Sequence, residues 1–166
     1  MDIHPDSPVR RATLEVESHV GDAGWDQPPR LFALVDTRRL MAENPDLAQA
    51  LSLGNEFTPV EQENLPEGDF EEVLTQIAWP ESVDGVAAVV ERLMLPPQAE
   101  ADLPDDAQAA LVIAQSHPER RDVRIAAAVL RDGSVHSAVR GRLGDELLEG
   151  TGLVPGLIEV LRGTLT

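Results

Sequence analysis

The sequence predicts an α+β fold in which helices pack on a mostly antiparallel sheet of about four strands. Three observations lead to this class. Apolar residues recur at helical spacing in several segments, β-branched runs are bounded by turn residues, and two such runs flank Asp132-Gly133. The expected order is α-β-(αα)-loop-α-β-α-β-β-α in one compact domain of residues 1–166, with residues 1–6 as a frayed tail.

The chain is expected to begin with a helix over Ser7–Val20. Ser7 can cap this helix, and Pro8 fits its first position because the missing N–H has no partner there. Residues on its buried side would be Val9, Ala12, Val16 and Val20. Residues on its outward side would be Arg10, Arg11, Glu15 and Glu17.

The next segments alternate between short elements and a loop. Leu31–Val35 is a short apolar run typical of a buried strand, and two small helices are expected over Arg38–Glu43 and Asp46–Leu53. Residues Gly54–Gly68 are rich in acids and proline and show no sustained period, which predicts an exposed loop. Asp69 then caps a helix that ends at Pro80, with an apolar stripe formed by Phe70, Val73, Leu74 and Ile77.

The second half contains most of the expected sheet. Gly85–Leu95 is β-branched and bounded by turn residues, which predicts a long strand, and Pro96–Pro104 is expected to be a linker. A helix should follow over Asp105–Ser116. Its buried side would consist of Ala109, Leu111, Val112 and Ala114.

Residues 122–142 give the clearest local signal, a β-hairpin. Asp132-Gly133 suits a two-residue type I′ turn, which would place Ala126 opposite Val139. Both faces of the first strand are apolar, so each needs a cover. A last helix over Leu153–Leu165, with Pro155 in its first turn, could supply one through Leu157, Ile158, Leu161 and Leu165.

The net charge of −17 is distributed unevenly. Residues 41–106 carry sixteen Asp or Glu and one basic residue, Arg92, giving −15, whereas residues 107–142 carry six Arg and three acids. The Arg-rich segment has no aromatic residue beside it, and the whole chain would repel phosphate, so no nucleic-acid partner is expected. The acidic segment is instead compatible with a basic protein partner.

The sequence contains no recognisable catalytic or metal-binding motif. Cysteine is absent, the four histidines have no metal-ligand spacing, and no nucleophile elbow or phosphate-binding glycine loop occurs. Ser134 and His136 are expected at a polar hairpin edge. We therefore predict no catalytic residues, no cofactor and no metal.

The sequence also shows no recognisable targeting signal. The first eleven residues lack an apolar core and carry two Asp, and no apolar run approaches the length of a membrane span. These features predict a cytoplasmic protein that does not bind membranes. The oligomeric state expected is monomer or homodimer.

Three segments carry a resemblance to a known family: Phe70–Pro80, His117–Arg124 and Val129–Gly133. They resemble an uncharacterised family of small acidic actinobacterial proteins, and the resemblance covers nearly the whole chain from Arg11 onward. It implies no assigned activity and no catalytic residues. The element order is also similar to that of type III secretion chaperone-like folds, which bind partner segments and often dimerise.

Two functional classes remain after these exclusions. The first is a non-catalytic protein-binding or chaperone-like module, in which the loop after residue 54 contacts the partner. Its candidate partner-binding residues are Glu56, Phe57, Glu61, Glu63 and Leu65. The alternative is an enzyme of unfamiliar type that uses Asp or Glu together with Arg124, Arg140 or Arg142.

Overall fold

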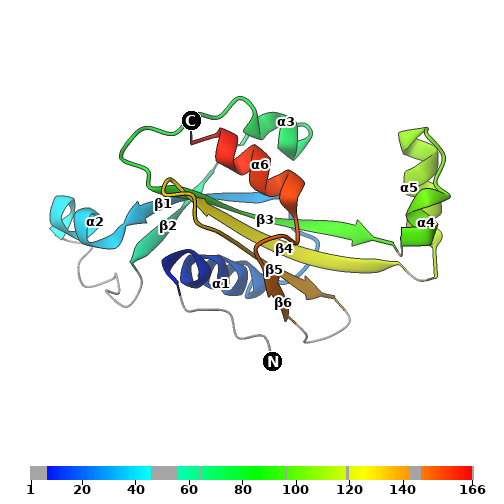
Figure 1. The fold of residues 1–166 in the computed structure, drawn as a ribbon, viewed down its shortest axis with the longest axis horizontal. Coiled ribbons are helices and arrows are strands. Elements are labelled where there is room, and N and C mark those ends of the chain that lie inside the picture. The colour runs from blue at the N-terminus through cyan, green and yellow to red at the C-terminus, as the bar shows by residue number, and fades with distance from the viewer. Residues whose placement is uncertain are drawn as a thin grey trace.

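A single antiparallel sheet lies at the centre of the molecule, with helices on both of its faces (Figure 1). The computed structural model of the chain describes residues 7–45, 56–63, 65–95, 97–118, 120–142 and 147–165. Within these ranges six strands pair in the order β2-β1-β3-β4-β5-β6. The strands are β1 Arg30–Asp36, β2 Phe57–Gln62, β3 Gly85–Met94, β4 Arg121–Leu130, β5 Val135–Gly141 and β6 Leu147–Gly150. The α+β class and the antiparallel pairing are confirmed, whereas the expected number of about four strands was wrong.

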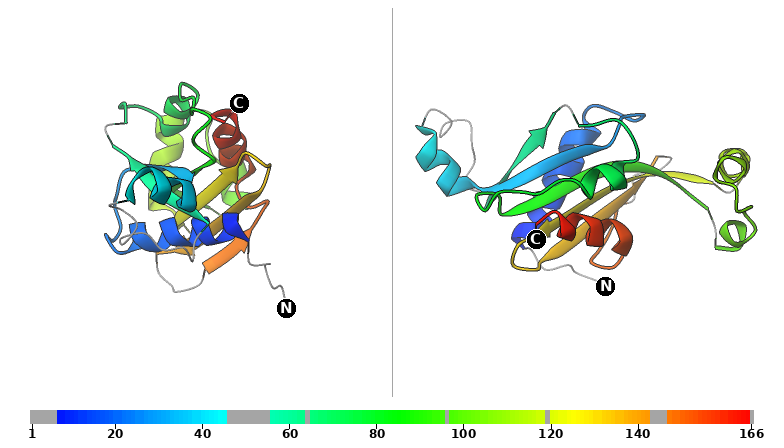
Figure 2. Two further views of the ribbon diagram at one scale, coloured as in Figure 1. Left: turned by 90° about the vertical axis from the view of Figure 1, so that its left-hand side faces the viewer. Right: turned by 90° about the horizontal axis from the view of Figure 1, so that it is seen from above.

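Six helices accompany the sheet in the described ranges. They are α1 Pro8–Gly21, α2 Thr37–Glu43, α3 Phe70–Leu74, α4 Pro97–Ala101, α5 Ala107–Ser116 and α6 Pro155–Gly163. Helix α1 covers one face of the sheet, and α6 with α3 covers the other (Figures 1 and 2). None of these helices is both long and apolar enough to cross a bilayer. The expected helix over residues 46–53 and the expected tail lie outside the described residues.

Helix α1 begins as the sequence predicts. Ser7 is its N-cap, with Oγ accepting a hydrogen bond from the Arg10 amide at 3.2 Å, and Pro8 occupies the first turn. The four apolar residues expected on its inner side are all buried. Glu17 was expected to face outward and is instead only 3% exposed, because its carboxylate pairs with Arg140 on β5 at 2.5 Å.

Each face of the sheet packs against its own hydrophobic cluster. On β4, Ala126 and Ala128 face α1, while Ile125, Ala127 and Val129 face α6. The α6 residues expected to pack here, Leu157, Ile158, Leu161 and Leu165, are all buried. Both faces of this strand are therefore covered by a helix, as its apolar pattern requires.

The hairpin between β4 and β5 forms, but with a register shifted by one residue. Ala126 pairs with Ala138 and Ile125 with Val139, so the expected pairing of Ala126 with Val139 was wrong. A type I′ turn needs positive φ at both central residues, and of Asp132 and Gly133 only the glycine has it, at 95°. Asp132 instead accepts a hydrogen bond from the Ser134 amide at 2.8 Å, which gives a three-residue turn.

Two strands were not predicted from the sequence pattern. Residues 57–62 were expected in a loop and form β2, which pairs with β1 at one side of the sheet. Pro59 obscures the pattern, although proline is tolerated on an edge strand because its missing N–H can face away from the neighbour. Strand β6 has only four residues, too few to show an alternation.

The connection from β3 to β4 forms a helical arm, defined here as residues 95–120, that projects from one end of the sheet (Figures 1 and 2). The expected linker over residues 96–104 contains α4, and α5 follows with Asp106 as its cap. Leu111 and Val112 were expected on a buried side but are 53% and 65% exposed. In α5 only Ala114 is buried, because the arm extends beyond the sheet that was expected to cover it.

Helix α3 is shorter than its apolar stripe indicates. It ends at Leu74 rather than near Trp79, and a hydrogen-bonded turn continues to Ile77. Phe70, Val73 and Leu74 are buried as expected, so the predicted inner side of this segment is confirmed although its length was wrong.

Candidate functional site

The five candidate partner-binding residues lie along the β2 side of the sheet. Glu56 directly precedes β2, Phe57 and Glu61 lie in it, and Glu63 and Leu65 follow it. The structure therefore brings them together along an edge strand rather than an irregular loop. Their position at the edge follows from the strand order, in which β2 is the outermost strand on that side.

Two hollows are lined in part by this strand. The larger, of about 510 Å³, is lined by Gln27, Pro28, Pro29, Arg30, Glu61, Gln62, Glu63 and Leu65. The smaller, of about 180 Å³, is lined by Glu15, Val16, His19, Phe32, Thr58, Pro59 and Glu61. Glu61 borders both hollows, Glu63 also borders the larger and Glu15 the smaller, so each hollow has acidic side chains at its rim.

Arg30 and Glu61 form an ion pair; Glu61 lines both hollows and Arg30 lines the larger. Arg30 donates from Nε to Oε2 at 2.7 Å and from Nη2 to Oε1 at 2.5 Å. Phe32 is the strand partner of Glu61, so Arg30 reaches its carboxylate diagonally across the β1–β2 pair. The hydrogen bonds that Arg30 donates to Glu61 lower the pKa of Glu61 below its ordinary value and raise the pKa of Arg30. Glu61 is therefore already neutralised, whereas Glu56 and Glu63 are exposed.

The two apolar candidates contact opposite sides of the sheet. Phe57 is partly buried against the cluster under α1, and Leu65 packs against the cluster under α6. Sequence reasoning missed Val60, which is 40% exposed in β2 and is the more accessible apolar side chain. Its accessibility depends on how β2 pairs with β1, and the sequence pattern does not predict that register.

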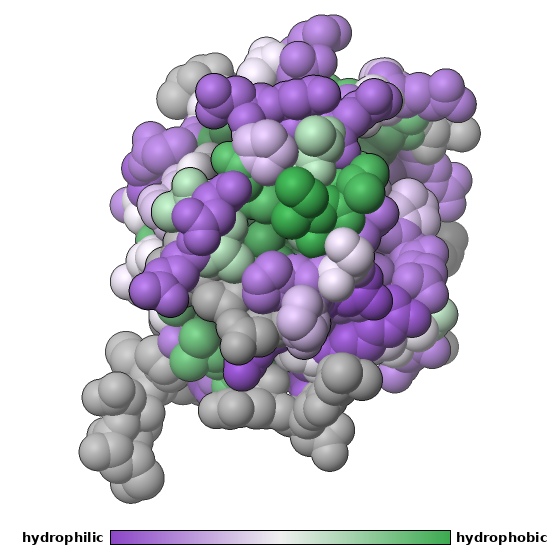
Figure 3. Space-filling view, turned by 90° about the vertical axis from the view of Figure 1, so that its right-hand side faces the viewer, coloured by the Kyte–Doolittle hydropathy of each residue, from purple (hydrophilic) through white to green (hydrophobic). Residues whose placement is uncertain are grey.

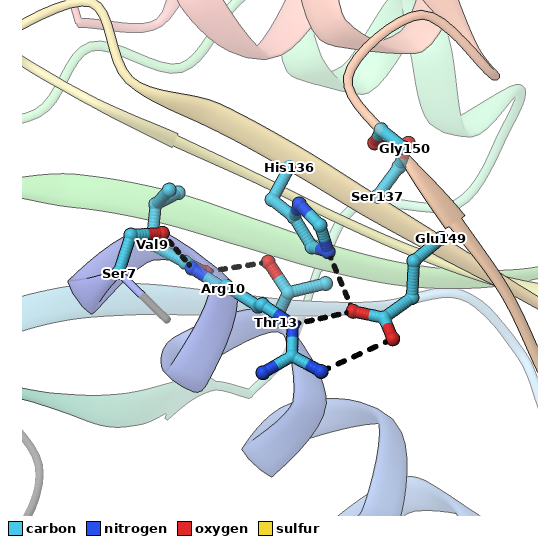
Figure 4. Close-up of polar contacts among 8 residues, drawn as sticks. All are labelled: Ser7, Val9, Arg10, Thr13, His136, Ser137, Glu149 and Gly150. Carbon is cyan, nitrogen blue, oxygen red and sulfur yellow. Dashed lines mark hydrogen bonds and ion pairs between the residues drawn. The ribbon is translucent and has the colours of Figure 1, made fainter. Parts of the chain in front are cut away.

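A buried polar group joins α1 to the β5–β6 edge (Figure 4). His136 is 4% exposed, and its Nε2 lies 2.9 Å from Oε1 of Glu149. Arg10 donates to the same carboxylate from Nε at 2.8 Å and from Nη2 at 3.2 Å. The hydrogen bond from Arg10 is the chief cause that lowers the pKa of Glu149, and His136 adds to it. His136 was expected at a polar hairpin edge and is instead enclosed between α1 and the sheet.

Of the arginines in the enzyme alternative, Arg124 and Arg140 lie on neighbouring strands and Arg142 directly follows β5. Arg124 of β4 pairs directly with Arg140 of β5 in the sheet register, and Arg140 binds Glu17 of α1. Arg124 is 2% exposed and donates from Nη2 to the Gly24 carbonyl at 2.5 Å. These contacts hold the end of α1 and the loop after it against the sheet.

Trp25 completes this arginine cluster. The guanidinium carbon of Arg124 lies 4.4 Å from the centre of the indole ring, and that of Arg142 lies 5.5 Å from it. Arg142 also binds Asp26 through two hydrogen bonds of 2.7 and 2.8 Å. Neither hollow beside β2 is lined by any residue of this cluster.

Within the described ranges, no three His, Asp or Glu side chains lie close enough together to hold a metal ion. The described part of the structure therefore offers surfaces and ion pairs rather than a coordination site.

The chain belongs to the PPA1309-like protein family, whose family model matches residues 9–166. The match extends over almost the whole chain and confirms the predicted resemblance to an uncharacterised family. No curated protein and no solved structure matches the chain.

Proposed function

We propose that the chain is a non-catalytic protein-binding module that recognises a basic segment of a partner protein at the β2 side of its sheet. The observation that carries this proposal is the pair of hollows beside β2, both bordered by Glu61. An extended segment lying across the strand could place side chains in both hollows. Glu56 and Glu63 are exposed beside them and would attract basic groups.

The charge of the surrounding chain supports a basic partner. Residues 41–106 carry −15, and their single basic residue, Arg92, binds Glu71 at 3.0 Å. A surface of one sign accelerates association with a partner of the opposite sign. Val60 would add an apolar contact at the strand itself.

The contacts made by the arginines of the enzyme alternative favour binding over catalysis. Arg140 and Arg142 are held by Glu17 and Asp26, and Arg124 lies over Trp25. Two of the three arginines are thus neutralised by carboxylates, and these contacts stabilise the packing of α1 and the loop after it against the sheet. The proposal retains a chaperone-like role in the cytoplasm of an actinobacterium, in line with the alanine-rich, lysine-free composition.

The test uses a partner captured from the native host and then purified. Glu56→Gln with Glu63→Gln removes two exposed charges beside β2, and Glu72→Gln with Glu81→Gln removes two exposed charges elsewhere in the acidic segment. We expect only the first pair to slow association. The wild-type rate should fall with salt, because the screening length shrinks from about 10 Å at 0.1 M to about 3 Å at 1 M.

Substitution of the apolar residue Val60 provides the second measurement. Val60→Ala should raise the dissociation rate without changing the association rate, because buried apolar contacts hold a complex while rim charges steer it. If the β2 charge variant and Val60→Ala both bind the purified partner with wild-type rates, this surface is not the binding site. A captured partner without a basic segment would contradict the electrostatic part of the proposal.

A further inference from the structure

The outer edge of β2 is a place where a strand from a partner protein could join the sheet, because no described strand pairs with that edge. An edge strand carries a row of backbone N–H and C=O groups that an added strand would use. The register of the β1–β2 pair determines which groups of β2 belong to this row. The composition of the row then decides what kind of segment the edge accepts.

The backbone groups of Pro59 point away from β1. Leu34 is the strand partner of Pro59, and its carbonyl accepts a hydrogen bond from the Asp84 amide at 2.8 Å, directly before β3. The Thr37 amide donates to the Glu56 carbonyl at 3.0 Å, so the pair that contains Glu56 is hydrogen-bonded. Hydrogen-bonded and non-hydrogen-bonded pairs alternate along an antiparallel ladder. The alternation directs the backbone groups of residues 58, 60 and 62 toward β1 and those of residues 57, 59 and 61 outward.

The outward row contains three carbonyls but only two N–H groups, because its middle residue is Pro59. A strand laid along β2 in either direction would leave one of its own carbonyls facing the proline ring without a donor. A backbone carbonyl without a partner costs free energy, and proline within sheets is for this reason found on edge strands. Pro59 therefore opposes the addition of a strand to β2.

The charged side chains left open beside this row are hydrogen-bond acceptors. Glu56 and Glu63 are exposed, and no described side chain pairs with either carboxylate. The nearest arginine, Arg30, is already bound to Glu61 and donates to the Gln27 side chain at 3.1 Å. Arginine and lysine side chains carry several donors and no acceptor, so they complement a surface of this kind.

Apolar contact contributes little at this edge. Val60 is the one exposed large apolar side chain in β2. Larger apolar exposure lies on α5, through Leu111, Val112 and Ile113, and the end of the molecule that carries the arm shows a hydrophobic patch surrounded by hydrophilic side chains (Figure 3). The arm projects away from β2 (Figures 1 and 2), so that patch does not extend the β2 surface.

We propose that the basic segment of the partner binds the β2 edge through its arginine or lysine side chains and does not add to the sheet as a strand. These side chains donate to the outward carbonyls of β2 and to Glu56 and Glu63. The inference rests on the proposed function and specifies how that site recognises its partner. The outward carbonyls belong to alternate residues, about 6.7 Å apart. Basic residues at every second position of an extended segment have the same spacing, so such a segment matches the row.

Two synthetic peptides separate side-chain binding from strand addition. Both alternate arginine with valine, and in one of them every backbone amide is N-methylated, so it keeps the side chains but cannot pair as a strand. Loss of a single backbone hydrogen bond lowers affinity about fivefold, and a strand-adding peptide would lose several. We expect both peptides to bind the full chain with dissociation constants that agree within about threefold. Nuclear magnetic resonance should show shifts in β2 without protection of the Phe57 and Glu61 amides from hydrogen exchange.

The charge variants show whether the peptides bind at β2. Glu56→Gln with Glu63→Gln should weaken the binding of both peptides. Glu72→Gln with Glu81→Gln removes two exposed charges elsewhere in the acidic segment and should weaken it less.

Pro59→Val provides the converse test, because it restores the missing N–H and valine is a favoured strand residue. The unmethylated peptide should bind this variant at least about fivefold more tightly than the wild-type chain, with protection of the Phe57 and Glu61 amides. The methylated peptide should bind both chains equally. Equal binding of the unmethylated peptide to both chains would contradict the role given to Pro59.

The two ways of failing are distinguishable. If only the unmethylated peptide binds the wild-type chain and protects the Phe57 and Glu61 amides, the partner can add as a strand; this inference is then overturned and the proposed function stands. If neither peptide binds at β2, this inference and the electrostatic part of the proposed function are both overturned.

Discussion

Replacement of the whole arm by a tight turn should leave the fold intact and slightly more stable. Met94 and Arg121 are strand partners at the ends of β3 and β4, so an Asn-Gly pair can join them directly. The arm contributes little to the hydrophobic core, since Ala114 is the one described α5 residue that is buried. Removal of residues 95–120 therefore costs little buried apolar area.

The expected gain comes from loop closure. Shortening the connection from roughly 26 residues to two reduces the entropy cost of closing the hairpin by about 2 kcal/mol. Allowing for the few contacts of the arm, we expect the free energy of unfolding to rise by about 1 to 2 kcal/mol. In a domain of this size such a gain corresponds to an increase in melting temperature of about 4 °C.

Thermal unfolding followed by circular dichroism measures this change. A control with a glycine-serine connection of the original length separates the effect of loop length from the loss of the helices, and should be less stable than the short variant. A short variant that loses more than about 1 kcal/mol would refute the reasoning, because that loss would mean that the arm is an integrated part of the core.

Two further predictions follow from single contacts. Gly85→Ala would place Cβ 2.7 Å from the Val129 carbonyl oxygen, so it should cost about 1 to 3 kcal/mol in urea unfolding. Gly141→Ala, whose Cβ meets nothing within 4 Å, is the matched control and should change stability little; equal effects would contradict the packing argument. The pKa of Glu149 is lowered by Arg10, so its contribution to stability is present above its ordinary pKa of 4.5 and is lost as the pH falls through the lowered folded-state value. Glu149→Gln should reduce the loss of unfolding free energy as the pH falls below that ordinary value, and an unchanged slope would show that this carboxylate does not contribute.

The sequence predicts the elements of the central hairpin but not their register. Strand β4 is apolar on both faces, so the usual alternation does not tell which residues face α1 and which face α6. The register then depends on the turn alone. The side chain of Asp132 binds the Ser134 amide and changes a two-residue turn into a three-residue one, which shifts every pair by one position.

The arm shows a different limit of sequence reasoning. Apolar residues in α5 predict a helix with a buried side, because periodicity indicates that a face is apolar but not that anything covers it. Leu111 and Val112 were therefore placed in the core and lie outside it. The exposed position depends on the projection of the β3–β4 connection, which only the tertiary structure reveals.

The candidate binding residues were predicted as parts of an exposed loop, whereas the structure places some of them in a strand. Acidic side chains and an aromatic in a proline-containing segment indicated an exposed loop, and the exposed positions of Glu56 and Glu63 agree with that expectation. The strand character of residues 57–62 and the Arg30–Glu61 ion pair depend on contacts with β1. Their role in binding a partner remains a prediction.

The order of strands has a consequence for how the chain folds. Strands β4, β5 and β6 are neighbours both in sequence and in the sheet, whereas β1 joins β3 through pairs such as Leu34 with Gly85. Contacts between distant residues form later because their loop-closure entropy must be overcome first. Amides of β4 and β5 should thus gain protection before those of β1 in pulse-labelled refolding, and simultaneous protection would show that the sheet assembles in one step. The C-terminal half would then serve as the template onto which the N-terminal strands and α1 are added.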